Sequence, residues 1–217
     1  MKTKAHIRYR NKANEIVPGV TTINRIGNFG GKTEQLIRWG NKLGLQGIDS
    51  TKFRDEKGLI GDLAHEMIMA HLLGHEVDTA DFTKNQMEPA EHCFGEWYKW
   101  WETEKTETIL VEVPLVSELF QFGGKPDHFG QKGIHILDDW KTGFVSIDAY
   151  IQCCAYRELL IENGYPAADL IRIASLPRDK GESFRVYEIT EFDLGWQAFK
   201  NLRQCYELEP ALRKILK

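Results

Sequence analysis

Apolar residues recur at two different spacings along the chain. In the first half they lie three or four positions apart, as on one face of a helix, and predict helices over residues 34–43, 59–73 and 91–104. In the middle, β-branched and apolar runs bounded by turn residues predict strands over residues 108–116, 119–129 and 134–141. The change of period separates a helical beginning from a sheet-forming middle.

The last third mixes both signals. A helix is expected over residues 147–163, where a Gly-Tyr-Pro turn ends it, and strands over residues 170–176 and 184–189 precede a final helix that begins near Phe192. Ahead of all predicted helices, residues 15–26 carry the β-branched residues typical of a strand, around a Pro-Gly turn signal. This order predicts a mixed β-sheet with helices on its faces, an α/β or α+β domain.

The composition is that of a globular protein. Of 217 residues, 42% are hydrophobic and 28% are charged, which excludes a disordered or collagenous chain. The length predicts one domain over residues 1–217, with a basic N-terminal region over 1–57 and a core over 58–217. No apolar run approaches the ~20 residues that span a bilayer, and the start MKTKAHIRYRNK lacks the apolar part of a secretory signal. We therefore expect a cytoplasmic protein without a membrane span, whose four cysteines are reduced and mostly buried.

The charge is unevenly distributed. The net charge of -4 does not indicate a nucleic-acid binder, but residues 1–57 hold 12 Lys and Arg against 5 Asp and Glu, whereas residues 58–217 hold 16 against 27. A basic first quarter is typical either of an arm that faces phosphates or of an ordinary solvated surface.

The densest group of reactive side chains lies over residues 123–156. Asp127 precedes a turn and Asp139 lies in the returning strand, so a hairpin that turns near position 133 places the two carboxylates roughly opposite each other. Lys141 leaves the strand on the same side as Asp139. Paired carboxylates attract a hard cation such as Mg²⁺ or Mn²⁺, and a nearby ammonium can orient water or stabilise charge on a phosphate. For each residue alone, a surface ion pair or a turn residue is the simpler interpretation.

These residues also spell a known signature. Pro126-Asp127 and Asp139-Trp140-Lys141, with eleven residues between the acids, match the PD-(D/E)XK nucleases. Further short motifs occur in the order that resembles the RecB-type and phage-type exonuclease branch of that superfamily. They are Lys141-Thr142-Gly143, then Gln152 and Tyr156 on the next helix, Gly61 and His65 on an upstream helix, and the opening segment 17–23. The resemblance covers about residues 17–160.

The resemblance implies a restriction-endonuclease-like core and a role for each matching residue. His65, Asp127 and Asp139 are then the metal ligands, and Lys141 is the catalytic lysine beside the attacking water. His65 depends on this resemblance most, because a lone histidine on a helix is usually structural.

Four more residues concern the same site. Gln152 and Tyr156, one helical turn apart, are expected to hold the DNA strand or the lysine. Asp138 competes as the second acid, but only Asp139 shares Lys141's side of the strand. Glu112, between two valines, is either a metal-binding glutamate, as in some relatives, or a surface carboxylate, and it stays outside the predicted ligand set.

The function implied by the resemblance is a deoxyribonuclease that depends on Mg²⁺ or Mn²⁺. An exonuclease for DNA recombination, repair or phage replication is favoured, with single-stranded DNA or free DNA ends as its partner. A homo-oligomer or a recombination partner protein stays open. No iron–sulfur cluster is expected, because Cys153 and Cys154 lie inside the helix of Gln152 and Tyr156 and only Cys205 follows.

Three other functions compete. A catalytically silent DNA-binding module has the same scaffold, but the presence of both acids and the lysine argues against it. An adaptor domain would use the Trp-rich segment 94–101 as a partner surface, although tryptophans more often fill a core. A P-loop NTPase is suggested by the Gly-Gly-Lys-Thr at 30–33, but the pattern needs a glycine where Ile26 stands.

Overall fold

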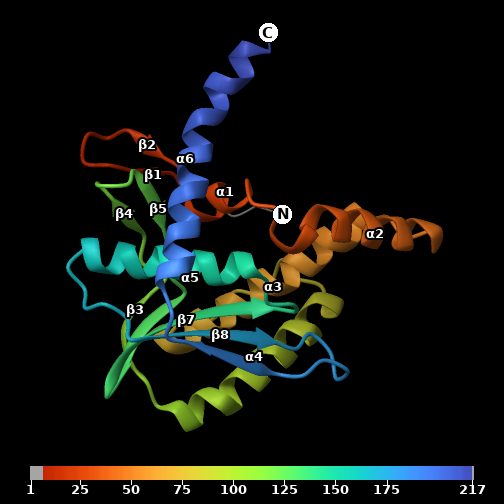
Figure 1. The fold of residues 1–217 in the computed structure, drawn as a ribbon. Coiled ribbons are helices and arrows are strands. Elements are labelled where there is room, and N and C mark those ends of the chain that lie inside the picture. The colour runs from red at the N-terminus through yellow and green to blue at the C-terminus, as the bar shows by residue number, and fades with distance from the viewer. Residues whose placement is uncertain (1–6, 217) are drawn as a thin grey trace.

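A five-stranded mixed sheet forms the centre of the computed structural model, which describes residues 7–216 (Figure 1). Its strands lie side by side in the order β3 (Glu107–Val111), β6 (His128–Lys132), β7 (Ile134–Thr142), β8 (Leu170–Leu176) and β9 (Arg185–Ile189). β7 is antiparallel to β6 and parallel to β8, and every other pair is antiparallel. The predicted mixed α/β architecture is confirmed.

Helices cover both faces of this sheet (Figure 1). α1 (Val20–Asn24), α5 (Ile147–Glu162) and α6 (Asp193–Ile215) lie on one side, and α3 (Ser50–Leu73) and α4 (Lys84–Glu104) lie on the other. α2 (Lys32–Leu45) contacts α3 and projects from the body. One apolar cluster joins α1, α5 and α6 to the sheet through side chains such as Leu137 and Ile173. A second joins α3 and α4 to the other face through Trp140 and Ala174. Strand alternation therefore sends neighbouring residues of β7 into two different environments.

Two of the predicted strands are wrong in extent. The segments 108–116 and 119–129 each contain a break, and their inner parts form a separate two-stranded hairpin, β4 (Leu115–Ser117) and β5 (Phe122–Gly124). The physical reason is backbone conformation. Glu112, with φ +48°, breaks the first segment, and Gln121, with φ +53°, delays the start of β5, while the second segment breaks at residues 125–127, which include Pro126. Pro114 then removes a donor from the first segment.

The N-terminal segment also differs from its strand pattern. Only Ile16–Val17 (β2) is a strand, paired with Tyr9–Arg10 (β1), while Val20–Asn24 is helical. Tyr9 packs on Gly123 of β5, where no side chain would fit, and Val20 and Ile23 enter the same apolar cluster as α5. Burial against α5 overrides the local strand propensity of the β-branched residues. The division into 1–57 and 58–217 stays a prediction, and residues 1–6 lie outside the described range.

Two helices begin earlier than their apolar pattern. α3 starts at Ser50 because the Asp49 side chain accepts hydrogen bonds from the N–H groups of Thr51 (2.9 Å) and Lys52 (3.1 Å). α4 starts at Lys84, where the side chain of Gln86 accepts from the N–H of Thr83 at 2.9 Å. These polar caps extend the helices beyond their buried faces.

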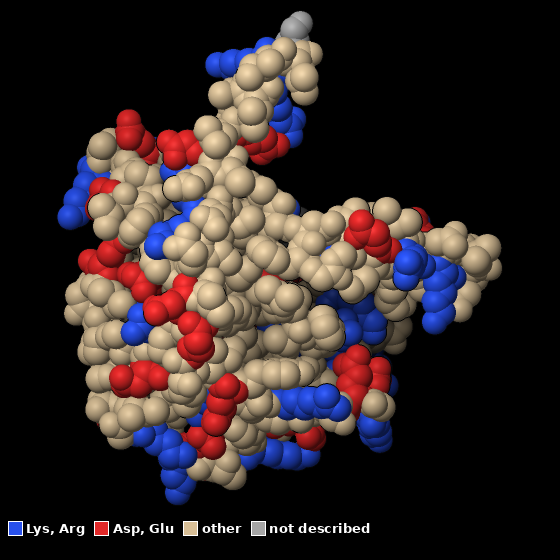
Figure 2. All heavy atoms as spheres, viewed as in Figure 1, with Lys and Arg blue, Asp and Glu red and all other residues tan. Residues whose placement is uncertain are grey.

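The surface shows mixed charge on the side seen in Figure 2, with Lys and Arg gathered on and below the projecting α2. The C-terminal part of α6 also projects from the body (Figure 1). Within residues 7–216, no helix is long and apolar enough to cross a membrane.

Candidate active site

The hairpin of β6 and β7 brings the two predicted acids together. It turns at Gly133, whose φ is +75°, and pairs His128 with Asp138, so that Asp127 and Asp139 occupy the next position at the end of the ladder. The Asp127 Oδ2 atom accepts a hydrogen bond of 2.8 Å from the N–H of Trp140. Asp127 therefore lies against the strand that carries Asp139 and Lys141.

Asp139 and Lys141 form an ion pair on one side of β7. Lys141 Nζ lies 2.5 Å from Asp139 Oδ2, the carboxylate is fully buried, and 27% of the lysine side chain is exposed. Asp139 Oδ1 is also buried and accepts no hydrogen bond from any residue that the structure describes. A buried carboxylate oxygen without a donor is costly, and a bound cation would relieve that cost.

The pKa values of Asp139 and Lys141 are both shifted by burial and by the other charged groups close to them. The pKa of Asp139 is raised to about 6 because burial and the nearby carboxylate of Asp127, which raise it, together outweigh the ammonium of Lys141, which lowers it. For Lys141, burial opposes the charge, but the carboxylates of Asp139 and Asp127 outweigh burial and hold its pKa above the ordinary value. The lysine is thus an ammonium that donates hydrogen bonds.

A second group of side chains meets at Asp127. His65 of α3 places its Nδ1 atom 3.7 Å from Asp127 Oδ2. Glu112, directly after β3, joins them, and one ligand atom from each of the three residues lies within 4.8 Å of the others. The α3 helix reaches this position because Gly61 packs against the Thr142 side chain without room for a Cβ atom. The donors are two carboxylates and one imidazole, a set suited to a divalent cation.

Glu112 is the residue of this group that the predicted ligand set omits. Its left-handed backbone is held by its own N–H, which lies 3.1 Å from the Pro126 carbonyl oxygen and 3.2 Å from that of Asp127. A non-glycine residue with positive φ is a local strain that persists only when its surroundings impose it. Its flanking valines gave the sequence signal, but the strand pattern could not show this turn. Asp139, a predicted ligand, lies outside the group of three.

Asp138 belongs to the opposite side of the strand. It is fully buried, with its Oδ2 2.8 Å from His128 Nδ1 and its Oδ1 2.6 Å from Arg172 Nε. Burial acts to raise its pKa, but the hydrogen bonds from His128 and Arg172 outweigh burial and hold the pKa below its ordinary value. The predicted choice of Asp139 over Asp138 as the acid beside Lys141 agrees with this placement.

Gln152 and Tyr156 of α5 lie on the Asp139 side. The amide of Gln152 donates to the hydroxyl of Tyr156 at 2.7 Å. Tyr156 is buried against Gly124, and burial, followed by the charges of Asp127 and Asp139, raises its pKa well above the ordinary value. The two side chains are therefore joined to each other close to the acids, and their expected hold on the DNA strand or the lysine stays a prediction.

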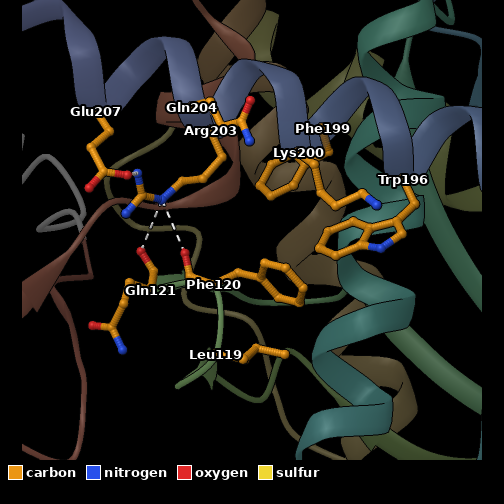
Figure 3. A pocket seen from close by; sticks show the side chains of 9 residues that line it. All are labelled: Leu119, Phe120, Gln121, Trp196, Phe199, Lys200, Arg203, Gln204 and Glu207. Atoms are coloured by element: carbon orange, nitrogen blue, oxygen red, sulfur yellow. Dashed lines mark hydrogen bonds and ion pairs between the residues drawn. The ribbon is translucent and has the colours of Figure 1, made fainter.

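A pocket of about 250 Å³ opens beside Lys141. Its lining includes Gln152 and the basic residues Arg25 and Lys32, the latter paired with Asp148 at 2.6 Å. A larger pocket, of about 320 Å³, lies between α6 and the turn at 119–121 (Figure 3). There the Nε atom of Arg203 donates to the Phe120 carbonyl at 3.1 Å, and the pocket shares no residue with the site.

Two of the competing functions lose their structural basis. The glycines at 30–31 belong to a short 3₁₀ turn, Phe29–Gly31, that comes after α1, whereas a P-loop follows a strand. The Trp-rich helix is largely internal, since Trp97 and Trp101 are buried and pack around Trp140. These tryptophans are core residues and offer no large partner surface.

Comparison with known proteins adds the following. No protein-family model and no curated protein matches the chain. Similar solved structures include a protein of Eubacterium rectale assigned as an exonuclease, with 16% identity, a TM-score of 0.49, and coverage of 67% of this chain and 64% of that one. Another is the alkaline exonuclease of Laribacter hongkongensis, with 16% identity, a TM-score of 0.38, and coverage of 71% and 81%. The match spans less than two thirds of the first, and both TM-scores are below 0.5, so we infer function from the site's side chains.

Proposed function

We propose that the protein is a metal-dependent DNA nuclease, and that it acts as an exonuclease. The observation that carries this proposal is the fully buried carboxylate of Asp139, paired with Lys141 and facing Asp127 beside a His65–Glu112–Asp127 donor group. A structural ion pair needs no such surplus of acids. Three carboxylates and an imidazole, with only the ammonium groups of Lys141 and Lys125 paired to them, are typical of a site whose charge is completed by a ligand.

The donor set fits Mg²⁺ or Mn²⁺. Carboxylate oxygens are the ligands these ions prefer, and Asp139 Oδ1 has a free, buried lone pair directed at no protein donor among residues 7–216. We assign Asp127, Glu112 and His65 as holding the ion, with Asp139 as a further ligand. When bound, such an ion polarises a phosphate oxygen and lowers the pKa of a coordinated water.

The chain's own residues supply the remaining functions. The Lys141 ammonium, fixed by Asp139, orients the attacking water and stabilises negative charge that develops on the phosphate. The linked side chains of Gln152 and Tyr156 position the scissile strand against this lysine. The pocket that contains Arg25, Lys32 and Lys141 offers cations for phosphates next to the cleaved bond. Attack of the water in line with the P–O3′ bond, with the 3′-oxygen as the leaving group, would leave a 5′-phosphate and a 3′-hydroxyl.

The test is cleavage of end-labelled linear DNA, single- and double-stranded, with a closed circle alongside. Wild type and Lys141→Ala are compared in Mg²⁺, Mn²⁺ and EDTA. We expect metal-dependent loss of linear DNA by the wild type only, with the circle intact. Cleavage of the closed circle would show that the protein is an endonuclease and contradict the proposed exonuclease activity. DNA binding without cleavage in any metal would favour the silent-module alternative.

A further inference from the structure

Lys125 makes an ion pair with one of the proposed metal ligands. Its Nζ atom contacts Glu112 Oε2, and the side chains are 29% and 18% exposed respectively. No resemblance to other proteins singled out this lysine. It stands two residues before Asp127, with buried Pro126 between them, so Lys125 and Asp127 leave the chain toward the same half-exposed side.

The Glu112 carboxylate has little freedom to move away from its partners. Its backbone is locked in the left-handed region by the hydrogen bonds to the Pro126 and Asp127 carbonyls, which belong to the same segment as Lys125. The same carboxylate group brings an oxygen within 4.8 Å of ligand atoms of His65 and Asp127. One short side chain thus faces both an ammonium and the position where the donor group would hold a divalent ion.

An ammonium and a divalent cation repel each other strongly at such separations, particularly where the site is half-buried. Lys125 ends in a flexible four-carbon chain that is 29% exposed, whereas Glu112 has a backbone held by two hydrogen bonds and a less exposed side chain. Of the two cations at this carboxylate, the lysine is therefore the one that can leave. Once it leaves, a positive charge is set free at the rim of the site.

We infer that Lys125 is an exchangeable counter-ion: it neutralises Glu112 in the metal-free protein, is displaced by the metal, and then binds a phosphate of the DNA strand. This inference rests on the proposed function, because it assumes that Glu112 and its neighbours bind a metal and that DNA is the substrate. It makes Lys125 a positioning residue that couples metal loading to substrate binding.

The first arm of the test measures Mn²⁺ binding by calorimetry, without DNA, for wild type, Lys125→Met, Lys125→Arg and a control, Lys132→Met. Lys132 also pairs with a glutamate, Glu104 at 3.2 Å, but outside the donor group. Lys125→Met should bind Mn²⁺ about tenfold more tightly, because the competing cation is gone, a change of about 1.4 kcal/mol. Lys125→Arg and Lys132→Met should stay near wild type. Unchanged or weaker binding by Lys125→Met would overturn the inference.

The second arm measures binding of a single-stranded phosphorothioate oligonucleotide at several salt concentrations. With Mn²⁺, Lys125→Met should bind this DNA several-fold more weakly, and its salt slope should fall by about one. In EDTA the two proteins should bind DNA alike, since Glu112 holds the lysine. Equal DNA binding by both proteins in Mn²⁺ would remove the phosphate role.

The two levels of the proposal fail differently. If the wild type binds no Mn²⁺, or if Asp127→Asn binds Mn²⁺ as well as the wild type does, the proposed metal site itself is wrong. If the wild type binds Mn²⁺ through Asp127 and only the Lys125 effects are missing, the counter-ion role alone is wrong. Thermal unfolding in EDTA checks that each variant is folded.

Discussion

Asp138 and Asp139 are neighbours on the same strand, are both fully buried, and have opposite surroundings. Both oxygens of Asp138 accept hydrogen bonds, from His128 and Arg172, and its pKa is held below the ordinary value. Asp139 has one ion-pair partner, its Oδ1 atom accepts no hydrogen bond from residues 7–216, and its pKa is raised to about 6, mainly by burial. One residue of offset on a strand changes which helices a side chain meets.

The difference separates a carboxylate used for structure from one available for chemistry. Asp138 is fully satisfied by the protein, and Arg172 also pairs with Glu104 at 2.6 Å and lies over the Trp100 ring. In such a network every hydrogen-bonding atom of the Asp138 carboxylate has a protein partner, so the carboxylate is not available to a ligand. The Asp139 side instead carries excess negative charge, which is unfavourable until a cation binds.

The largest expected effect on stability is at Asp138. Asp138→Asn removes the charge that faces the buried guanidinium of Arg172, and breaking such a pair costs about 3–5 kcal/mol. Because Glu104 still pairs with the Arg172 guanidinium in this variant, a loss at the lower end of this range is expected. Urea unfolding in EDTA at pH 7.5 measures it. A loss below about 1 kcal/mol would show that the network contributes little.

Asp139→Asn should instead increase the stability of the metal-free protein. A folded-state pKa raised from 3.8 to about 6 means that ionisation of Asp139 opposes folding, by up to about 3 kcal/mol. This penalty is absent below pH 4, grows between pH 4 and 6, and is complete above pH 6. In EDTA the variant should match wild type at pH 4 and be more stable at pH 7.5. A variant less stable than wild type at pH 7.5 would contradict this account of the site.

Asp127→Asn tests the metal side of the comparison. The substitution removes the negative charge of one proposed ligand, so Mn²⁺ affinity should fall at least about tenfold, while the remaining amide oxygen still accepts from the N–H of Trp140. Calorimetric titration with Mn²⁺ measures this, and Asp138→Asn serves as the control with unchanged affinity. Equal affinity of wild type and Asp127→Asn would exclude Asp127 as a ligand.

The smallest effect is expected at Tyr156. Tyr156→Phe keeps the buried ring and removes only the hydroxyl that accepts from Gln152, an interaction worth about 1 kcal/mol. The KM for DNA should rise a few-fold with kcat nearly unchanged. A large loss of kcat would instead place the hydroxyl at the reacting atoms.

Alternation along a strand made part of this site predictable. It placed Asp139 and Lys141 on one side and Asp138 on the other, while the hairpin turn near position 133 was expected from the turn residues at 130–133. Glu112 could not be placed in this way, because its position depends on a left-handed backbone and on carbonyls of the next strand. The contact of His65 with Asp127 is also tertiary, and only the motif resemblance indicated it.

The fold shows the same division. β7, β8 and α5 have nearly the predicted bounds, since each is a continuous apolar or amphipathic run buried in the core. The segments that failed are those where backbone geometry or burial overrides the local pattern, at residues 108–129 and at α1. The spacing of apolar residues indicates which face of a helix or strand is buried. It does not indicate where the chain leaves a sheet.

The most direct test of the account is the cleavage rate of linear DNA in saturating Mn²⁺ for two neighbouring variants, Asp138→Asn and Asp139→Asn, measured well below their unfolding temperatures. We expect Asp138→Asn to cleave within about threefold of wild type despite its lower stability, and Asp139→Asn to lose at least about a hundredfold although it is the more stable protein. Full activity of Asp139→Asn, or a folded but inactive Asp138→Asn, would contradict the proposed site. The second result would place the reaction on the Asp138 side of β7.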